Sequence, residues 1–148
     1  MILQESDQFV SPERAMRLFS TMYKTNHLIV KEVEEQLQFF NLTLGKLYLL
    51  VSLKRLGKTA QPSELSDALS LTRANISGLL NTLESNCLVS RRVDSSNRRR
   101  ILVQMTDASE KLLEEVLPVY VQTLSKRIQA RLSDKEQDQL ILLLNKLS

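Results

Sequence analysis

Residues 72–85 read Thr-Arg-Ala-Asn-Ile-Ser-Gly-Leu-Leu-Asn-Thr-Leu-Glu-Ser, and most of the predicted architecture follows from them. Their apolar residues recur at helical spacing, and threonine at the start is a residue type that caps helix N-termini. We therefore predict a helix from Arg73 to about Ser85. Its inner face should consist of Ile76, Leu79, Leu80 and Leu83. Its outer face is small or polar and consists of Ala74, Asn75, Ser77, Gly78, Asn81 and Thr82.

A second short helix is predicted immediately before this one. Pro62 suits a first helical turn, Gln61 precedes it, and Glu64 is placed to reach back as in an imperfect capping box. We expect three side chains to pack inward, namely Leu65, Ala68 and Leu69. Residues 70–72 form the break. Two short helices joined by a tight turn are typical of a helix-turn-helix, whose second helix enters the major groove of DNA.

Two strand-like runs follow the second helix, at residues 88–93 and 100–105, with a polar turn cluster at 94–99. This pattern predicts a β-hairpin, and we see no other strand signal in the chain. The hairpin concentrates arginines, namely Arg91, Arg92, Arg98, Arg99 and Arg100. Arginines on a protruding loop do not build a core, but they fit the narrow, electronegative minor groove of DNA.

Further helices are predicted on both sides of this centre, at residues 11–39, 43–57, 106–131 and from 133 onward. Ser11 should cap the first of them, and Pro118 should bend the third because it removes an amide donor. The first helix is long for a chain of 148 residues. Its apolar stripe needs a cover, which is often a second subunit.

Composition is that of one ordinary globular domain, with 43% hydrophobic and 25% charged residues and a net charge of +3. Three glycines and three prolines favour a mainly helical chain. The N-terminal residues do not form a signal peptide, and no apolar run is long enough to span a membrane. We expect a soluble, cytoplasmic protein that makes no membrane contact.

Catalytic and metal-binding patterns are missing from the sequence. There is no nucleophile–base motif and no glycine-rich phosphate loop. His27 is the only histidine and Cys87 the only cysteine, so we expect no metal site, no cofactor and no enzymatic activity. Cys87 is more simply an inert structural residue than a redox switch. We expect His27 at a subunit interface or near a pocket. We expect Tyr23, Tyr48, Phe39 and Phe40 in the core rather than around an effector cavity.

Motifs distributed over nearly the whole chain match one family. They are Leu42-Thr43, residues 62–66, residues 72–77, Leu83-Glu84, residues 88–91, Asp94, residues 97–99 and Met105-Thr106. On these residues the chain resembles the multiple-antibiotic-resistance regulator (MarR) family, including its SlyA-like members. The resemblance implies a mainly α fold with a small β-hairpin wing. It implies a winged helix-turn-helix at 42–106, intertwined with a helical dimerisation region at 1–41 and 107–148.

The resemblance also implies an obligate homodimer on a palindromic operator. Members are often released from DNA by small phenolic or other lipophilic ligands, or by thiol oxidation; the sequence does not mark the residues that would bind such a ligand. The chain departs from the family at three positions. Asn97 stands where a second wing acid is usual, and Ser109 where a glycine is common. Cys87 replaces the glycine that follows the recognition helix, so we expect Asn86 to adopt the left-handed backbone there.

We therefore predict a sequence-specific regulator that binds double-stranded DNA as a homodimer. The residues expected to contact DNA are Thr72, Arg73, Asn75, Ser77, Asn81, Arg98 and Arg99. Asparagine matches the donor–acceptor edge of adenine, and a helix N-terminus favours a phosphate. Two alternatives remain. A non-specific architectural DNA binder would show no base preference. A protein-interaction module that has lost DNA binding is disfavoured by the dense wing arginines.

Overall fold

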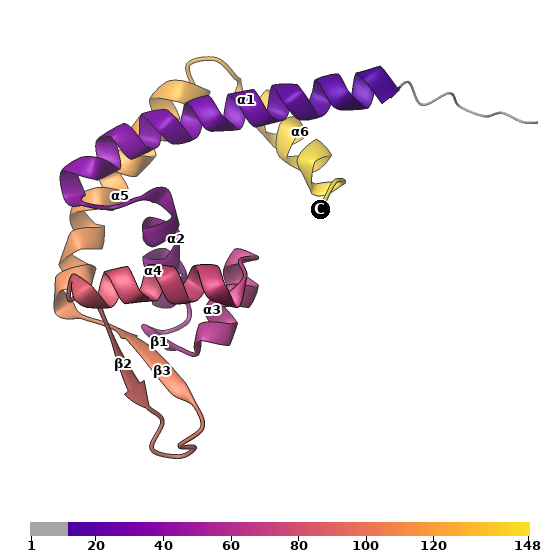
Figure 1. Ribbon diagram of the computed structural model, residues 1–148. Helices are drawn as coiled ribbons and strands as arrows, with labels where there is room; N and C mark the ends of the chain where they lie inside the picture. The colour runs from indigo at the N-terminus through magenta and orange to yellow at the C-terminus, as the bar shows by residue number, and fades with distance from the viewer. Residues whose placement is uncertain (1–11) are drawn as a thin grey trace, which may run out of the picture.

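The computed structural model describes residues 12–148 and shows a mainly helical chain with one small sheet (Figure 1). The helices are α1 (Pro12–Leu37), α2 (Leu44–Arg55), α3 (Pro62–Leu69), α4 (Arg73–Ser85), α5 (Asp107–Ile128) and α6 (Asp134–Asn145). The strands are β1 (Thr59–Ala60), β2 (Val89–Val93) and β3 (Ile101–Met105). The predicted fold class is confirmed. The predicted cap at Ser11 lies outside the described residues.

Hydroxyl caps begin four of the helices, at or beside the residues where the sequence predicts those helices to start. Thr43, Thr72, Thr106 and Ser133 each accept a hydrogen bond from the amide three residues further on. At α3, Glu64 reaches back to the amide of Gln61 at 2.7 Å. The long helices are shorter than predicted. A single 3-10 turn, η1 (Gln38–Phe40), follows α1, and α5 ends at Ile128 after continuing through Pro118.

The sheet has three antiparallel strands in the order β1-β3-β2. The predicted hairpin is present, with Val89 paired to Met105 and Val93 to Ile101. The prediction that it holds the only strands is wrong, because Thr59 pairs with Gln104 and Ala60 with Val103. A strand of two residues is too short to show an alternating pattern, so its pairing depends on the tertiary fold.

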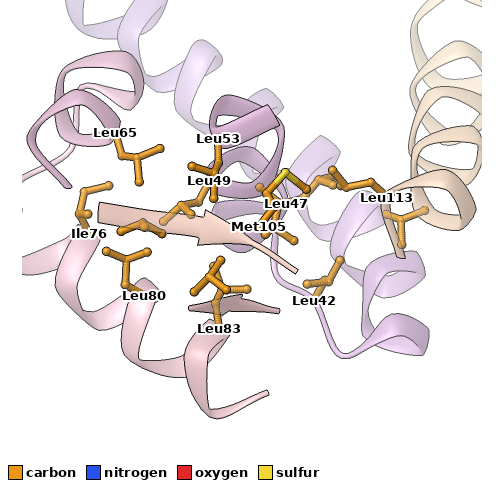
Figure 2. Close-up of a cluster of buried hydrophobic side chains, with 14 of the residues drawn as sticks. Leu42, Leu47, Leu49, Leu53, Leu65, Ile76, Leu80, Leu83, Met105 and Leu113 are labelled. Atoms are coloured by element: carbon orange, nitrogen blue, oxygen red, sulfur yellow. The ribbon is translucent and has the colours of Figure 1, made fainter. Parts of the chain in front are cut away.

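The core centres on α2, whose Leu47, Leu49, Leu50 and Leu53 are fully buried. Figure 2 shows Leu65 of α3 and Ile76, Leu80 and Leu83 of α4 pointing into the same cluster. Leu113 of α5 joins it from the other side. Burying one such side chain contributes about 1.5–3 kcal/mol, so this cluster holds α4 firmly in one orientation.

Several predicted core residues lie at the surface. Ala68 is exposed, and so are Tyr23 at 67%, Tyr48 at 43% and Phe39 at 77%. Only Phe40 of the four aromatics packs partly against the core. The core prediction for the other three is therefore wrong for a single chain. Of α1, only Val33 and Leu37 are buried, because just its C-terminal end meets the central cluster.

Candidate nucleic-acid interface

The outer face of α4 is open to solvent, as predicted. Ile76, Leu80 and Leu83 point inward and are at most 1% exposed. The opposite face presents Ala74, Asn75, Ser77, Gly78, Asn81 and Thr82, all exposed. A Cβ placed on Gly78 would meet nothing within 4 Å, so no neighbouring element of the described chain requires this glycine. Its surroundings leave room for another molecule to approach the helix backbone closely.

Arg91 joins the hairpin to α4, a link that sequence reasoning missed. Its Nη2 donates a hydrogen bond to Oδ1 of Asn81, and its Nε lies 3.6 Å from Oε2 of Glu84. The arginine is 25% exposed, unlike a freely solvated wing residue. One signal was available: Arg91 shares a strand face with Val89, which is buried. This contact ties the base of the wing to the recognition helix.

The wing tip is shaped by side chains that bond to nearby backbone. Oδ1 of Asp94 accepts hydrogen bonds from the amide and hydroxyl of Ser96, at 3.0 and 2.9 Å. These bonds, followed by the charges of Arg100 and Arg92, lower the pKa of Asp94. Oδ1 of Asn97 accepts from the amide of Arg99 at 3.1 Å. Asn97 therefore organises the turn through its amide oxygen at a position where the family usually has a carboxylate.

Arg98 and Arg99 are exposed at this tip. Within residues 12–148 their side chains make no ion pair and no hydrogen bond. Arg73 and Ser77 lie elsewhere, beside Arg91 in a hollow of about 380 Å³ between α3, α4 and the hairpin. The predicted contact residues thus form two groups, one along α4 and one at the wing tip. In Figure 1 the hairpin projects beyond the end of the helical core.

The turn after α4 corrects one prediction. Cys87 adopts the left-handed backbone with φ 58°, whereas Asn86 has φ −89°. The amide of Leu88 donates to the carbonyl of Leu83 at 2.9 Å, and that of Cys87 to Glu84 at 3.0 Å. This pair of bonds is the Schellman motif, which requires the left-handed residue one position later than we predicted. The thiol of Cys87 is exposed.

Comparison with known proteins identifies this arrangement. A family model for a winged helix DNA-binding domain matches residues 45–128. The HTH-type transcriptional repressor YetL of Bacillus subtilis is 30% identical over 138 residues, which cover 93% of this chain and 80% of YetL. The chain belongs to the MarR-like winged-helix transcriptional regulators.

Two solved structures show how widely the MarR fold extends along the chain. A mutant of E. coli MarR complexed with operator DNA is 23% identical, with a TM-score of 0.83 over 90% of this chain and 95% of that one. The organohalide-sensing regulator RdhR-CbdbA1625, bound to 2,4-dichlorophenol, is 18% identical. Its TM-score is 0.88 over 99% of this chain and 86% of that one.

Other features of this MarR-like chain lie away from α4 and the hairpin. His27 is exposed on α1, beside Lys31 and Glu34 in a shallow groove of about 400 Å³. Residues 12–148 contain no cluster of three histidine, cysteine or acidic side chains suited to a metal ion. Among the helices described, none is both long and apolar enough to cross a membrane.

Proposed function

We propose that two copies of this chain bind a palindromic operator and regulate transcription from it. The observation that carries the proposal is the juxtaposition of an exposed recognition face on α4, which has no acidic residue before Glu84, with an arginine-rich hairpin fixed beside it by Arg91. A major-groove helix and a minor-groove wing together cover two adjacent grooves of one half-site. Because YetL is named a repressor, repression is the expected direction of regulation.

Individual roles follow from the positions of the side chains. Asn75, Ser77 and Asn81 lie on the exposed face of α4 and are assigned to base edges. Thr72 and Arg73 begin the helix, where free amides and the helix dipole favour a phosphate. The side chains of Arg98 and Arg99 are assigned to the minor groove because they stand free at the wing tip.

The dimer part of the proposal rests on apolar surface that a single chain leaves uncovered. On α6 no residue is buried, and five apolar side chains are 40–60% exposed, namely Leu140, Ile141, Leu142, Leu143 and Leu144. Leu147, just beyond the helix, is 66% exposed. On α1, Met16, Phe19 and Tyr23 are 67–71% exposed. Monomers rarely expose patches of this kind, and a second copy buries them symmetrically. In Figure 1 both helices lie on the opposite side of the molecule from the hairpin.

On this basis we propose residues 1–41 and 107–148 as the dimerisation region and residues 42–106 as the DNA-binding region. A small phenolic or lipophilic effector that releases DNA would act at the junction of these regions, because a change there moves one DNA-binding unit relative to the other. Support comes from the fold likeness to a regulator bound to 2,4-dichlorophenol. Tyr48 of α2 and Tyr120 of α5 meet across this junction.

The experiment is selection of bound sequences from a random duplex pool at two salt concentrations. A two-fold symmetric motif, with half-sites about one helical turn apart, is the expected result. Salt-sensitive binding without any motif would instead indicate a non-specific architectural protein. No binding at all, after extraction of bound small molecules by unfolding and refolding, would indicate a protein-interaction module.

A further inference from the structure

Asn81 is held from one side by the wing, which restricts how its amide can face DNA. Nη2 of Arg91 donates a hydrogen bond to Oδ1 of Asn81. A guanidinium carries only donors, so the amide must turn its oxygen toward Arg91 and its own NH2 group away. Asn81 is exposed, and this NH2 group is therefore what it presents to an outside partner.

Arg91 has the surroundings of a residue that holds one fixed position. Its strand neighbour on the same face, Val89, is buried, which directs the guanidinium toward α4. Nε is buried and has no hydrogen-bond partner among the described residues, and Oε2 of Glu84 lies 3.6 Å away. Glu84 and Asn81 follow one another at helical spacing along α4, so one guanidinium meets both.

The charge of Arg91 also affects which base group can approach Asn81. A base donor that approached Oδ1 would meet the positive guanidinium already bonded to that oxygen, and would be repelled. Base acceptors that approached the NH2 group would be attracted. Adenine presents a donor beside an acceptor in the major groove, whereas guanine presents two acceptors, O6 and N7. The pairing with Arg91 therefore opposes the usual match of asparagine to adenine.

From this geometry we infer that Asn81 reads guanine as a donor-only side chain, and that Arg91 is the positioning residue that sets this preference. The inference rests on the proposed function, because it requires α4 to lie in the major groove of the operator. It separates Asn81 from Asn75, whose side chain makes no hydrogen bond within residues 12–148 and keeps both its donor and its acceptor for a base.

The test is the same random-pool selection, carried out with the wild-type chain and with Asn81→Ala, Arg91→Met and Arg92→Met. Asn81→Ala locates the contacted base pair, where the wild-type preference for guanine should fall about fivefold or more in each half-site. Arg91→Met keeps the apolar stem but removes the guanidinium, so preference at that base pair should move from guanine to adenine. Arg92→Met is the matched control. It removes one exposed positive charge from the same strand, and should weaken binding while leaving every base preference unchanged.

A further variant keeps the test meaningful if Arg91→Met does not fold. Asn81→Asp keeps an acceptor for Arg91 and removes the NH2 donors, so guanine preference should be lost and cytosine, which offers a donor, should be favoured. Adenine at the located base pair of the wild type would overturn the inference. The inference would also be overturned if the wild-type chain recovers a motif and Asn81→Ala weakens the base preference at no position of it. The proposed function would still stand in that case. Failure of the wild-type chain to recover any motif would overturn both.

Discussion

The hydroxyl oxygens of Tyr48 and Tyr120 lie 2.9 Å apart, in a hydrogen bond that joins α2 to α5. The two rings meet edge to face, with centroids 6.3 Å apart and planes at 89°. Burial, and next the hydrogen bond with Tyr48, raise the pKa of Tyr120. This contact connects the region assigned to DNA with the region assigned to dimerisation, so its strength bears on how firmly the two are held together.

Tyr48→Phe should lower the free energy of unfolding at neutral pH by about 1 kcal/mol, because it removes the hydrogen bond between the two hydroxyls. Urea denaturation of the two proteins measures the difference. An unchanged midpoint would show that the contact adds nothing to stability.

Tyr120 should also make stability depend on alkaline pH. A raised pKa means that the fold favours the neutral phenol, so this stabilisation is complete below the unfolded pKa of about 10 and is lost as pH rises through the higher folded pKa. The free energy of unfolding should therefore fall less steeply above pH 10 in Tyr120→Phe than in the wild type. Urea denaturation at several pH values measures both slopes, and equal slopes would contradict a raised pKa for Tyr120.

Cys87→Gly should stabilise the chain by about 1 kcal/mol, because the position has φ 58° and a Cβ is unfavourable in the left-handed region. Thermal unfolding measures the gain as a higher Tm. Cys87→Ala is the matched control, since it removes the thiol but retains the Cβ and should leave Tm nearly unchanged. If both variants stabilise equally, the thiol and not the backbone is responsible.

Local rules account for most of the fold. The caps at Thr43, Thr72, Thr106 and Ser133 were predictable because each depends on one side chain and an amide three residues away. The strand at Thr59–Ala60 was not, because it exists only through pairing with β3. The left-handed residue was assigned one position early, at Asn86, because asparagine tolerates that backbone well. The two bonds of the Schellman turn place it at Cys87 instead.

Arg98→Ala should weaken operator binding and lower the dependence of log affinity on log salt by about 1, because one charge contact with DNA is lost. Fluorescence anisotropy over a salt series gives both quantities. Arg131→Ala loses the same charge beyond the end of α5, outside the region assigned to DNA, and should leave the salt dependence unchanged. An equal effect of the two substitutions would show that net charge, and not the wing, governs binding.

Asn75→Ala should cost about 1–3 kcal/mol of binding free energy on the operator and little on random DNA, because the amide is assigned to a base edge. Asn86→Ala removes the same side chain just beyond α4 and serves as the control, with no expected loss on either duplex. Competition binding against both duplexes provides the comparison. An equal loss on the two duplexes would assign Asn75 to the DNA backbone.

For the candidate site, the sequence was most informative about what faces outward. The exposed side of α4 follows from helical periodicity alone, since its buried leucines and Ile76 leave only one face free. The bond between Arg91 and Asn81 was not predictable in this way, because it joins a strand to a helix across the fold. A count of the hairpin arginines does not distinguish Arg91 from Arg98. The structure places Arg91 against α4 and Arg98 at the free tip.

The spacing between the two selected half-sites tests whether the protein binds DNA as a dimer. In the proposed dimer, two chains held together by α1 and α6 would present their recognition helices at one fixed separation on one face of the duplex. Inserting five base pairs between the half-sites rotates one of them to the opposite face, and anisotropy should then show a loss of affinity of at least a hundredfold. Affinity that is unchanged by the insertion would mean that each chain binds its half-site independently, and would contradict the proposed dimeric regulator.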